Sequence, residues 1–250
     1  MNFNNRELQM FEVMRAFYES DIPVDFKGSM VLKALLNECG YSDSIRQTTD
    51  IDANWYSDSA PSKDLIIGSI QEILDKNNIP LNVSMYRMYG EGKSAGFDFT
   101  DPLTGDVVFT MDMDVNRPIP QTRIYEINDI RFKGVSPVQM IADKLYVISS
   151  DKVFRRIKDI VDLYYISTVF DFDRSAVSAA LKNSGRNLDD FDGFLNRKDD
   201  LRHAYDLFRF GGNIYKPPFD EVYNAAKDFI KPMLSKTLSK RRNKDKDIVR

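Results

Sequence analysis

The chain has 250 residues, of which 42% are hydrophobic and 29% are charged, and its formal net charge is −3. This composition is typical of a soluble globular protein that forms one large domain or two small ones. A net charge of this sign does not indicate nucleic-acid binding by the molecule as a whole, so any such affinity needs a local basic patch.

Two residue types are almost missing. The single cysteine, Cys39, excludes an internal disulfide, and the single histidine, His203, excludes a histidine-rich zinc site. Cys39 lies among apolar residues and is expected to be buried, whereas His203 is expected to be a surface or structural residue. If the protein is an enzyme, its chemistry therefore depends on carboxylates.

The N-terminal segment and the apolar stretches bear on the location of the protein. No apolar stretch approaches the roughly 20 residues that cross a bilayer. The N-terminal segment contains Glu7 and Glu12 and lacks the apolar core of a signal peptide. We therefore expect a cytoplasmic protein with no membrane partner.

Hydrophobic periodicity predicts two different halves. In the first half, helical spacing predicts helices over 6–19, 30–39 and from Ser62 to Pro80, and alternation predicts strands over 24–27, 46–55, 81–89, 95–100, 106–115 and 123–127. From Ser136 the pattern is almost wholly helical. We expect an α+β domain over 1–133 and a helical domain over 134–250 that forms a C-terminal bundle.

Two aspartates stand on the strand predicted over 46–55. Because side chains alternate along a strand, Asp50 and Asp52 face one way and Ile51 faces the other. Two carboxylates at this spacing can share a Mg²⁺ or Mn²⁺ ion, which prefers oxygen ligands. The alternative is an ordinary half-buried strand with its polar face in solvent.

A Gly-Ser pair precedes the helix before that strand. Gly28 allows close approach of the backbone to a ligand, the helix N-terminus favours anions, and the Ser29 hydroxyl can bind a phosphate oxygen. A phosphate site beside a metal-binding acid pair suits a nucleoside triphosphate. The alternative is an ordinary turn and helix cap.

A third carboxylate is expected from a neighbouring strand, over 106–115. Asp112 and Asp114 share one face of this strand. Asp114 is the preferred candidate because it stands where the strand ends, and Asp112 is the second candidate.

Four charged residues of the helical half have helical spacing. Lys144 shares a face with apolar residues, and the alternative to a functional role is a lysine whose stem packs while its ammonium reaches solvent. Asp159 and Asp162 fall together with Arg155 on the next helix, and the alternative there is a solvated, salt-bridging face. A basic tail, with Lys240, Arg241, Arg242 and Lys244, is either an RNA-phosphate contact or a frayed end.

The order of these motifs resembles the AbiEii family of nucleotidyltransferase toxins, which belongs to type IV toxin–antitoxin and phage abortive-infection systems. The resemblance implies a DNA-polymerase-β-like core. The resemblance also implies that Gly28 and Ser29 hold the nucleotide phosphates. It further implies that Asp50 and Asp52 bind the metal, Mg²⁺ or Mn²⁺, with Asp114 as the third acid.

In the helical half, the resemblance implies that Lys144 contacts the nucleotide and that Asp159 or Asp162 supplies a further essential acid. The implied activity is transfer of a nucleotide from an NTP by a two-metal mechanism, to an acceptor such as a tRNA 3′ end or a protein hydroxyl. A cognate antitoxin is then expected to be encoded nearby. The alternatives are a non-toxin nucleotidyltransferase of the same superfamily and a non-catalytic protein that binds a nucleotide or a partner.

Overall fold

The computed structural model describes residues 3–41, 45–56, 61–89, 94–115, 120–211 and 214–247, with the side chains of all of these except Tyr89 and residues 235–247. The chain divides into two compact units, the first formed mainly by residues up to Ser136 and the second mainly by residues from Pro137. The boundary expected at 133 and 134 falls inside a strand, Ile130–Val135. Within the described ranges, no helix combines the length and apolar character of a membrane span.

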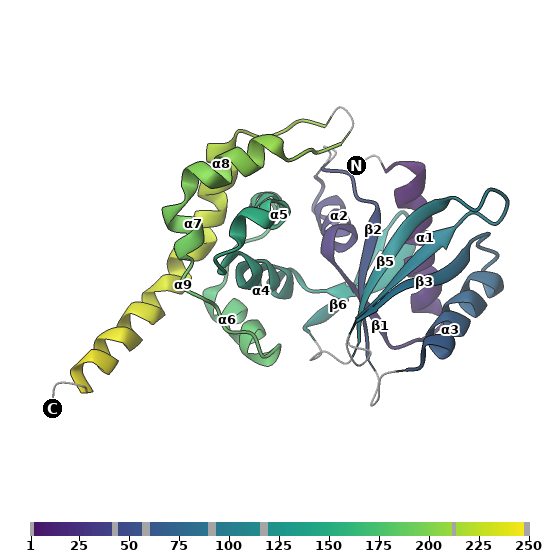
Figure 1. Ribbon diagram of the computed structural model, residues 1–250, viewed down its shortest axis with the longest axis horizontal. Helices are drawn as coiled ribbons and strands as arrows, with labels where there is room; N and C mark the ends of the chain where they lie inside the picture. The colour runs from purple at the N-terminus through teal and green to yellow at the C-terminus, as the bar shows by residue number, and fades with distance from the viewer. Residues whose placement is uncertain are drawn as a thin grey trace. The chain divides into compact units, whose positions relative to one another are not determined.

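The first unit is built on a mixed β-sheet (Figure 1). Its described strands are β1 Val24–Lys27, β2 Asp50–Trp55, β3 Asn82–Tyr89, β4 Ser94–Thr100, β5 Val107–Val115, β6 Thr122–Ile127 and β7 Ile130–Val135. They are arranged in the order β3-β4-β5-β2-β1-β7-β6. β2 pairs in parallel with β5 and antiparallel with β1, and β1 pairs in parallel with β7. The expected α+β class and the expected strands are confirmed, and β7 is a strand that the sequence analysis did not predict.

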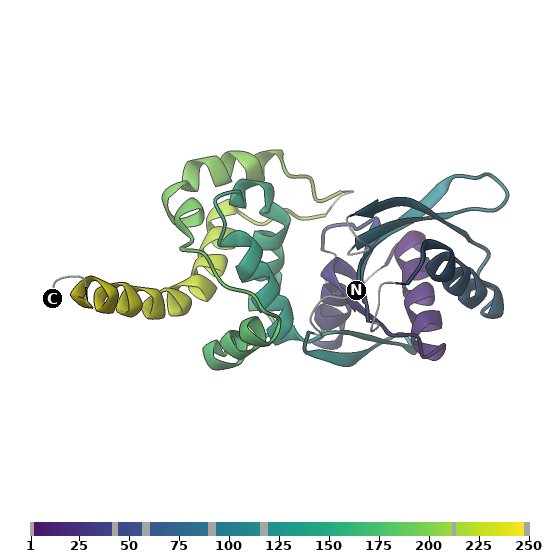
Figure 2. The same cartoon turned by 60° about the horizontal axis from the view of Figure 1, so that its bottom comes forward.

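Helices α1 Asn5–Glu19, α2 Gly28–Glu38 and α3 Lys63–Lys76 provide the apolar layer that packs on the sheet (Figures 1 and 2). Asn4 and Glu7 form a reciprocal capping box at the start of α1. Phe17 of α1 packs against Phe26 of β1, whose ring also meets Phe132 of β7 edge to face. The side chains that follow Phe26 across the sheet therefore form the buried face.

The opposite face of the sheet is polar. Along β2 and β5, Ile51 and Met111 are fully buried, whereas the acidic residues between the apolar ones are only partly covered. These acids are Asp50, Asp52, Asp112 and Asp114. The predicted alternation is therefore confirmed, and it places all four carboxylates on the face away from the aromatic core.

One expectation about burial is wrong and one is confirmed. Cys39 is exposed, because it is the C-cap residue of α2 and lies beyond the apolar face of that helix. His203 is exposed on a helix of the second unit, as expected.

All regular structure described in the second unit is helical. The helices are α4 Pro137–Ile148, α5 Ile157–Ser167, α6 Arg174–Asn183, α7 Asp192–Asn196, α8 Lys198–Leu207 and α9 Phe219–Asp247, with a 3₁₀ turn at Val153–Arg155. α4 packs against both α5 and α6, and α5 packs against α9. Phe194 of α7 stacks in parallel on Tyr223 of α9, with ring centroids 4.7 Å apart. This stacking holds α7 against α9, and α9 in turn packs against α5.

Candidate active site

The turn from β1 into α2 is formed by Gly28, and this position requires glycine for two reasons. Its φ of +71° is in the left-handed region, where a side chain is strained. A Cβ atom at Gly28 would also overlap the carboxylate of Asp52. The Asp52 carboxylate therefore lies directly against the N-terminus of α2, where the helix dipole favours negative charge.

Ser29, the next residue, is buried together with Arg46. The Arg46 guanidinium donates a hydrogen bond of 2.5 Å from Nη2 to the Ser29 Oγ. Because arginine can only donate, the serine oxygen is the acceptor, and its own proton remains to be donated to another group. The contact therefore orients the Ser29 hydroxyl as a donor near the N-terminus of α2. Sequence analysis did not identify Arg46, which stands shortly before the acidic strand.

The acid pair is held in the expected alternation. Asp50 accepts a hydrogen bond of 2.8 Å from the Thr48 hydroxyl. The parallel register of β2 and β5 sets Asp52 opposite Asp112 and Asn54 opposite Asp114. Acids that are far apart in the sequence are therefore neighbours on one face of the sheet.

The two candidates for the third acid each have a cation. Arg87 of β3 makes an ion pair of 2.6 Å with Asp112, and the Tyr86 hydroxyl donates a 3.1 Å hydrogen bond to the same oxygen. Burial raises the pKa of Tyr86 above its ordinary value, and the charge of Asp112 raises it further, so the phenol stays protonated as a donor. On the other side, Lys27 Nζ lies 2.5 Å from Asp114 and also donates to Asn54.

The donors available for a metal ion are the carboxylates of the acidic sheet face. Among them, no three histidine, cysteine or acidic side chains converge as a metal-binding cluster. Asp50 and Asp52 nevertheless supply carboxylate oxygens from one strand face. Mg²⁺ is usually bound by one or two carboxylates together with substrate phosphates, so this pair fits a metal ion that arrives with a nucleotide.

Lys144, Asp159 and Asp162 form a buried ionic cluster in the second unit. Their exposed fractions are 6%, 8% and 1%. The Lys144 ammonium lies 2.6 Å from Asp162 and 3.4 Å from Asp159. The interpretations of Lys144 as a lysine reaching solvent and of the aspartates as a solvated face are therefore wrong.

One atom of this cluster lacks a hydrogen bond. Oδ2 of Asp159 is buried and has no hydrogen-bond partner among the described residues, and the Arg156 guanidinium lies 3.9 Å from it. A buried carboxylate oxygen without a donor is costly, and such atoms often mark a place for a ligand or an ion. The side chains of the tail residues Lys240, Arg241, Arg242 and Lys244 lie outside the described ones.

The α+β fold of the chain is similar to that of known nucleotidyltransferases. The family model described as "Nucleotidyl transferase AbiEii toxin, Type IV TA system" matches residues 14–230. The chain therefore belongs to the AbiEii family of nucleotidyltransferase toxins. No curated protein sequence is similar enough to count as a relative.

The fold is shared with a solved structure. MenT4, a nucleotidyltransferase toxin from Mycobacterium tuberculosis H37Rv, superposes with a TM-score of 0.54 at 15% sequence identity, over 90% of this chain and 82% of that one. An antigenic nucleotidyltransferase-like protein from Paracoccidioides brasiliensis gives a TM-score of 0.45 at 15% identity, over 81% of this chain and 93% of that one. The family implies a nucleotide substrate and an antitoxin partner, and it confirms the resemblance drawn from the motifs.

Proposed function

We propose that the protein is a metal-dependent toxin with a polymerase-β-like core and a C-terminal helical bundle, which transfers a nucleotide from an NTP to an RNA acceptor such as a tRNA 3′ end. The observation that carries this proposal is the contact between Gly28 and the Asp52 carboxylate. It brings a helix N-terminus, which suits phosphate, against an acid pair, which suits a divalent cation. An NTP complexed with a metal ion needs both at one place.

In this proposal, the first turn of α2 and the Ser29 hydroxyl bind the phosphates. The Ser29 proton is available because Arg46 occupies an acceptor position of the same oxygen. Arg46 itself acts as a positioning residue. A phosphate oxygen that accepts from Ser29 would form a charge-assisted hydrogen bond, which is stronger than a neutral one.

Asp50 and Asp52 would hold the divalent ion, with Asp114 or Asp112 as the third acid. The strand register favours Asp112, since it stands directly opposite Asp52, whereas Asp114 stands opposite Asn54. When bound, Mg²⁺ or Mn²⁺ lowers the pKa of the attacking hydroxyl and neutralises the leaving pyrophosphate. The side chains supply alignment and charge, and no covalent intermediate on the protein is needed.

In the second unit, we assign different roles to the two aspartates. Asp162 is almost fully buried and makes the shorter contact to Lys144, so it orients the ammonium. Asp159 has a buried oxygen without a hydrogen-bond partner among the described groups, so it is the better candidate for the further essential acid. Lys144 would then contact the nucleotide.

Asparagine variants of the acid pair test this proposal. Asp50→Asn and Asp52→Asn keep the shape and remove one of two neighbouring like charges, so the metal-free variants should melt at or above the temperature of the parent. Incorporation of labelled NTP into RNA should be lost in both. Asp98→Asn is the matched control, because Asp98 pairs with Thr110 in the sheet and faces the same way as the acid pair.

Melting curves with and without Mg²⁺, measured beside the transfer assay, separate the possible outcomes. Loss of transfer in the Asp50→Asn and Asp52→Asn variants, with transfer kept in the Asp98→Asn control, means that activity depends specifically on the pair. Transfer that is retained in the variants of the pair means that activity does not depend on it. Active Asn variants of the pair that melt earlier than the parent would give these acids a structural role and would refute the proposed function.

A further inference from the structure

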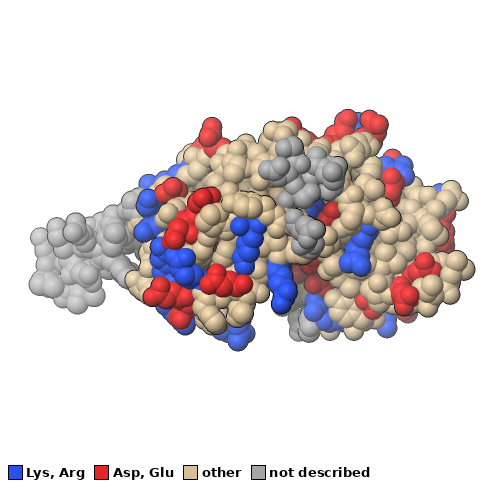
Figure 3. Space-filling model, turned by 90° about the horizontal axis from the view of Figure 1, so that it is seen from above, with Lys and Arg blue, Asp and Glu red and all other residues tan. Residues whose placement is uncertain are grey.

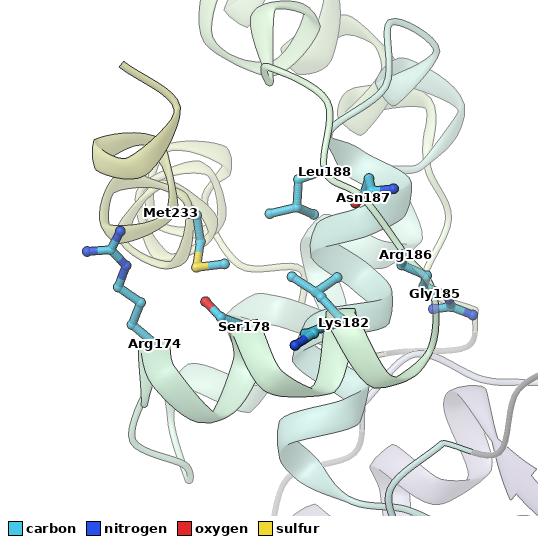
Figure 4. Close-up of a pocket in the computed structure, with 9 residues that line it drawn as sticks. Arg174, Ser178, Lys182, Gly185, Arg186, Asn187, Leu188 and Met233 are labelled. Atoms are coloured by element: carbon cyan, nitrogen blue, oxygen red, sulfur yellow. The ribbon is translucent and has the colours of Figure 1, made fainter. Parts of the chain in front are cut away.

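The second unit contains a pocket that the proposed reaction does not use (Figure 4). Its cavity volume is about 370 Å³, and it is lined by α6, by the segment that follows α6 and by Met233 of α9. This volume lies within the range of small-molecule and nucleotide sites. All of the lining residues belong to the second unit.

The charges around the pocket have one sign. Arg174, Lys182 and Arg186 line it, and the described lining residues include no acid. Arg186 is neutralised by an ion pair with Asp143. Arg174 and Lys182 make no ion pair with any side chain that the structure describes. Two uncompensated cations beside one hollow attract an anion.

The polar groups follow a regular spacing on α6. Arg174, Ser178 and Lys182 are each four positions apart, so they share one helix face and succeed one another at about 6 Å along the axis. Figure 4 shows the three side chains along the same helix, beside the hollow. A row of two cations and a hydroxyl at this interval suits neighbouring phosphates of a nucleic-acid strand better than one isolated ion.

The remaining wall of the pocket is apolar. Leu181, Leu188 and Met233 line it, together with Asn187. In Figure 4, Leu188 and Met233 lie on the same side of α6 as Ser178. A nucleotide unit presents a charged phosphate, an apolar face of the base and polar base edges, and this wall offers a matching surface for each part.

The charge of the pocket is not a property of the surface in general. On the face seen in Figure 3, lysine and arginine side chains are interspersed with aspartate and glutamate. On α8, for example, Lys198 and Arg202 both pair with Asp220. These two cations are therefore compensated, unlike Arg174 and Lys182.

We propose that this pocket binds the phosphodiester backbone of a single-stranded RNA segment, with one nucleotide unit inside it. The inference rests on the proposed function in one respect, namely that RNA is the acceptor of the transferred nucleotide. Arg174, Ser178 and Lys182 contact three successive phosphates, with Ser178 donating a hydrogen bond to the middle one, and the base packs against the leucine and methionine side chains.

The test measures binding of a fluorescent single-stranded RNA by anisotropy at several salt concentrations. The double variant Arg174→Gln/Lys182→Gln should bind roughly tenfold more weakly, and its salt slope should fall by about 0.7 for each lost phosphate contact. Lys198→Gln/Arg202→Gln is the matched control, because it removes two cations of the same unit that already pair with Asp220. The control should bind RNA with nearly the affinity of the parent.

Calorimetric titration with NTP and Mg²⁺ distinguishes RNA from free nucleotide as the ligand. Unchanged NTP affinity in the double variant supports the inference, together with a raised KM for RNA and an unchanged kcat. Unchanged RNA affinity, an equal loss in the control, or a parallel loss of NTP affinity would overturn it. If the parent transfers no nucleotide but the double variant still loses RNA binding, the proposed function fails while the RNA site stands.

Discussion

Replacing Lys144 by methionine is the sharpest perturbation of the second unit. The variant keeps the length of the side chain but removes an ammonium that lies 2.6 Å from Asp162 and 3.4 Å from Asp159. Removing one partner of a buried ion pair costs about 3–5 kcal/mol, since the other charge stays buried. For a chain of this size, that loss lowers Tm by about 10 °C.

Thermal denaturation measures this effect, and two further variants make the result specific. Lys158→Met is the same chemical change on an exposed lysine of α5, and it should shift Tm little. Lys144→Met/Asp162→Asn removes one of the two stranded carboxylates, so it should be more stable than the sum of the single variants predicts.

The same set separates folding from nucleotide binding. Lys144→Met alone would lose NTP affinity for two reasons, because the ammonium contact is removed and because part of the protein unfolds. The double variant Lys144→Met/Asp162→Asn should be folded and should still fail to bind NTP. A Tm for Lys144→Met equal to that of the parent, or strict additivity in the double variant, would refute the reasoning that Lys144 neutralises a buried acid cluster.

Gly28→Ala should lose nucleotide affinity, because the added Cβ displaces the Asp52 carboxylate. Gly40→Ala is the control, since Gly40 has a similar positive φ but open space around its Cβ. This control should lose only roughly 1–2 kcal/mol of stability, through backbone strain. Equal NTP affinities of the two variants would contradict this. Burial raises the pKa of Asp25 above its ordinary value of 3.8, although the nearby Lys133 opposes this shift. The contribution of Asp25 to folding stability is therefore full below pH 3.8, and it declines as the pH rises through the pKa of the folded state. Asp25→Asn should remove this decline, which denaturation curves measured at several pH values would show. If the stabilities of parent and variant fall in parallel as the pH rises, the prediction is contradicted.

β7 was not predicted from the sequence because its alternating pattern is short. β7 alternates buried and exposed residues, as a strand should, but only over Ile130–Val135 and with Gly134 inside it. The turn before it did carry a signal. Asn128 and Asp129 both have positive φ, which is typical of the tight turn of a β-hairpin. Reading that Asn-Asp pair as a hairpin turn would have predicted β7 and moved the expected boundary past it.

The candidate site was predictable only where it is local in the sequence. Gly28, Ser29 and the acid pair follow one another within a single β-α-β segment, so their spacing and the alternation of the strand identify them. Arg87 reaches Asp112 from β3, with β4 lying between the two strands in the sheet. Such a contact depends on strand order and register, which the pattern of one segment does not contain.

Lys144 shows the same limit in a helix. Its apolar neighbours on α4 fit either a lysine that reaches solvent or one that is buried, and the choice depends on what the next helix offers. α5 packs against α4 and brings Asp159 and Asp162 to the ammonium. The apolar neighbours of Lys144 therefore indicated that its position is unusual for a lysine. Its acidic partners could be identified only from the tertiary structure.

The acidic face of the sheet has a charge balance that constrains the proposed reaction. Its acids do not rely on solvent alone: Asp112 and Asp114 are each held by a cation, Arg87 and Lys27, and Asp52 lies at the positive end of α2. Like charges at this spacing would otherwise repel one another. Neither Asp112 nor Asp114 can bind a divalent ion at full strength while its cation remains in place.

In the proposed reaction, the acids and their cations must therefore exchange partners together. Asp112 or Asp114 can turn to a divalent ion only as Arg87 or Lys27 turns away, and a released cation on this face needs a new anion. The phosphates of the incoming nucleotide are such anions, and they arrive with the divalent ion that the acids take up. Metal and nucleotide should consequently bind more tightly together than either binds alone, since each supplies the charge that the other displaces.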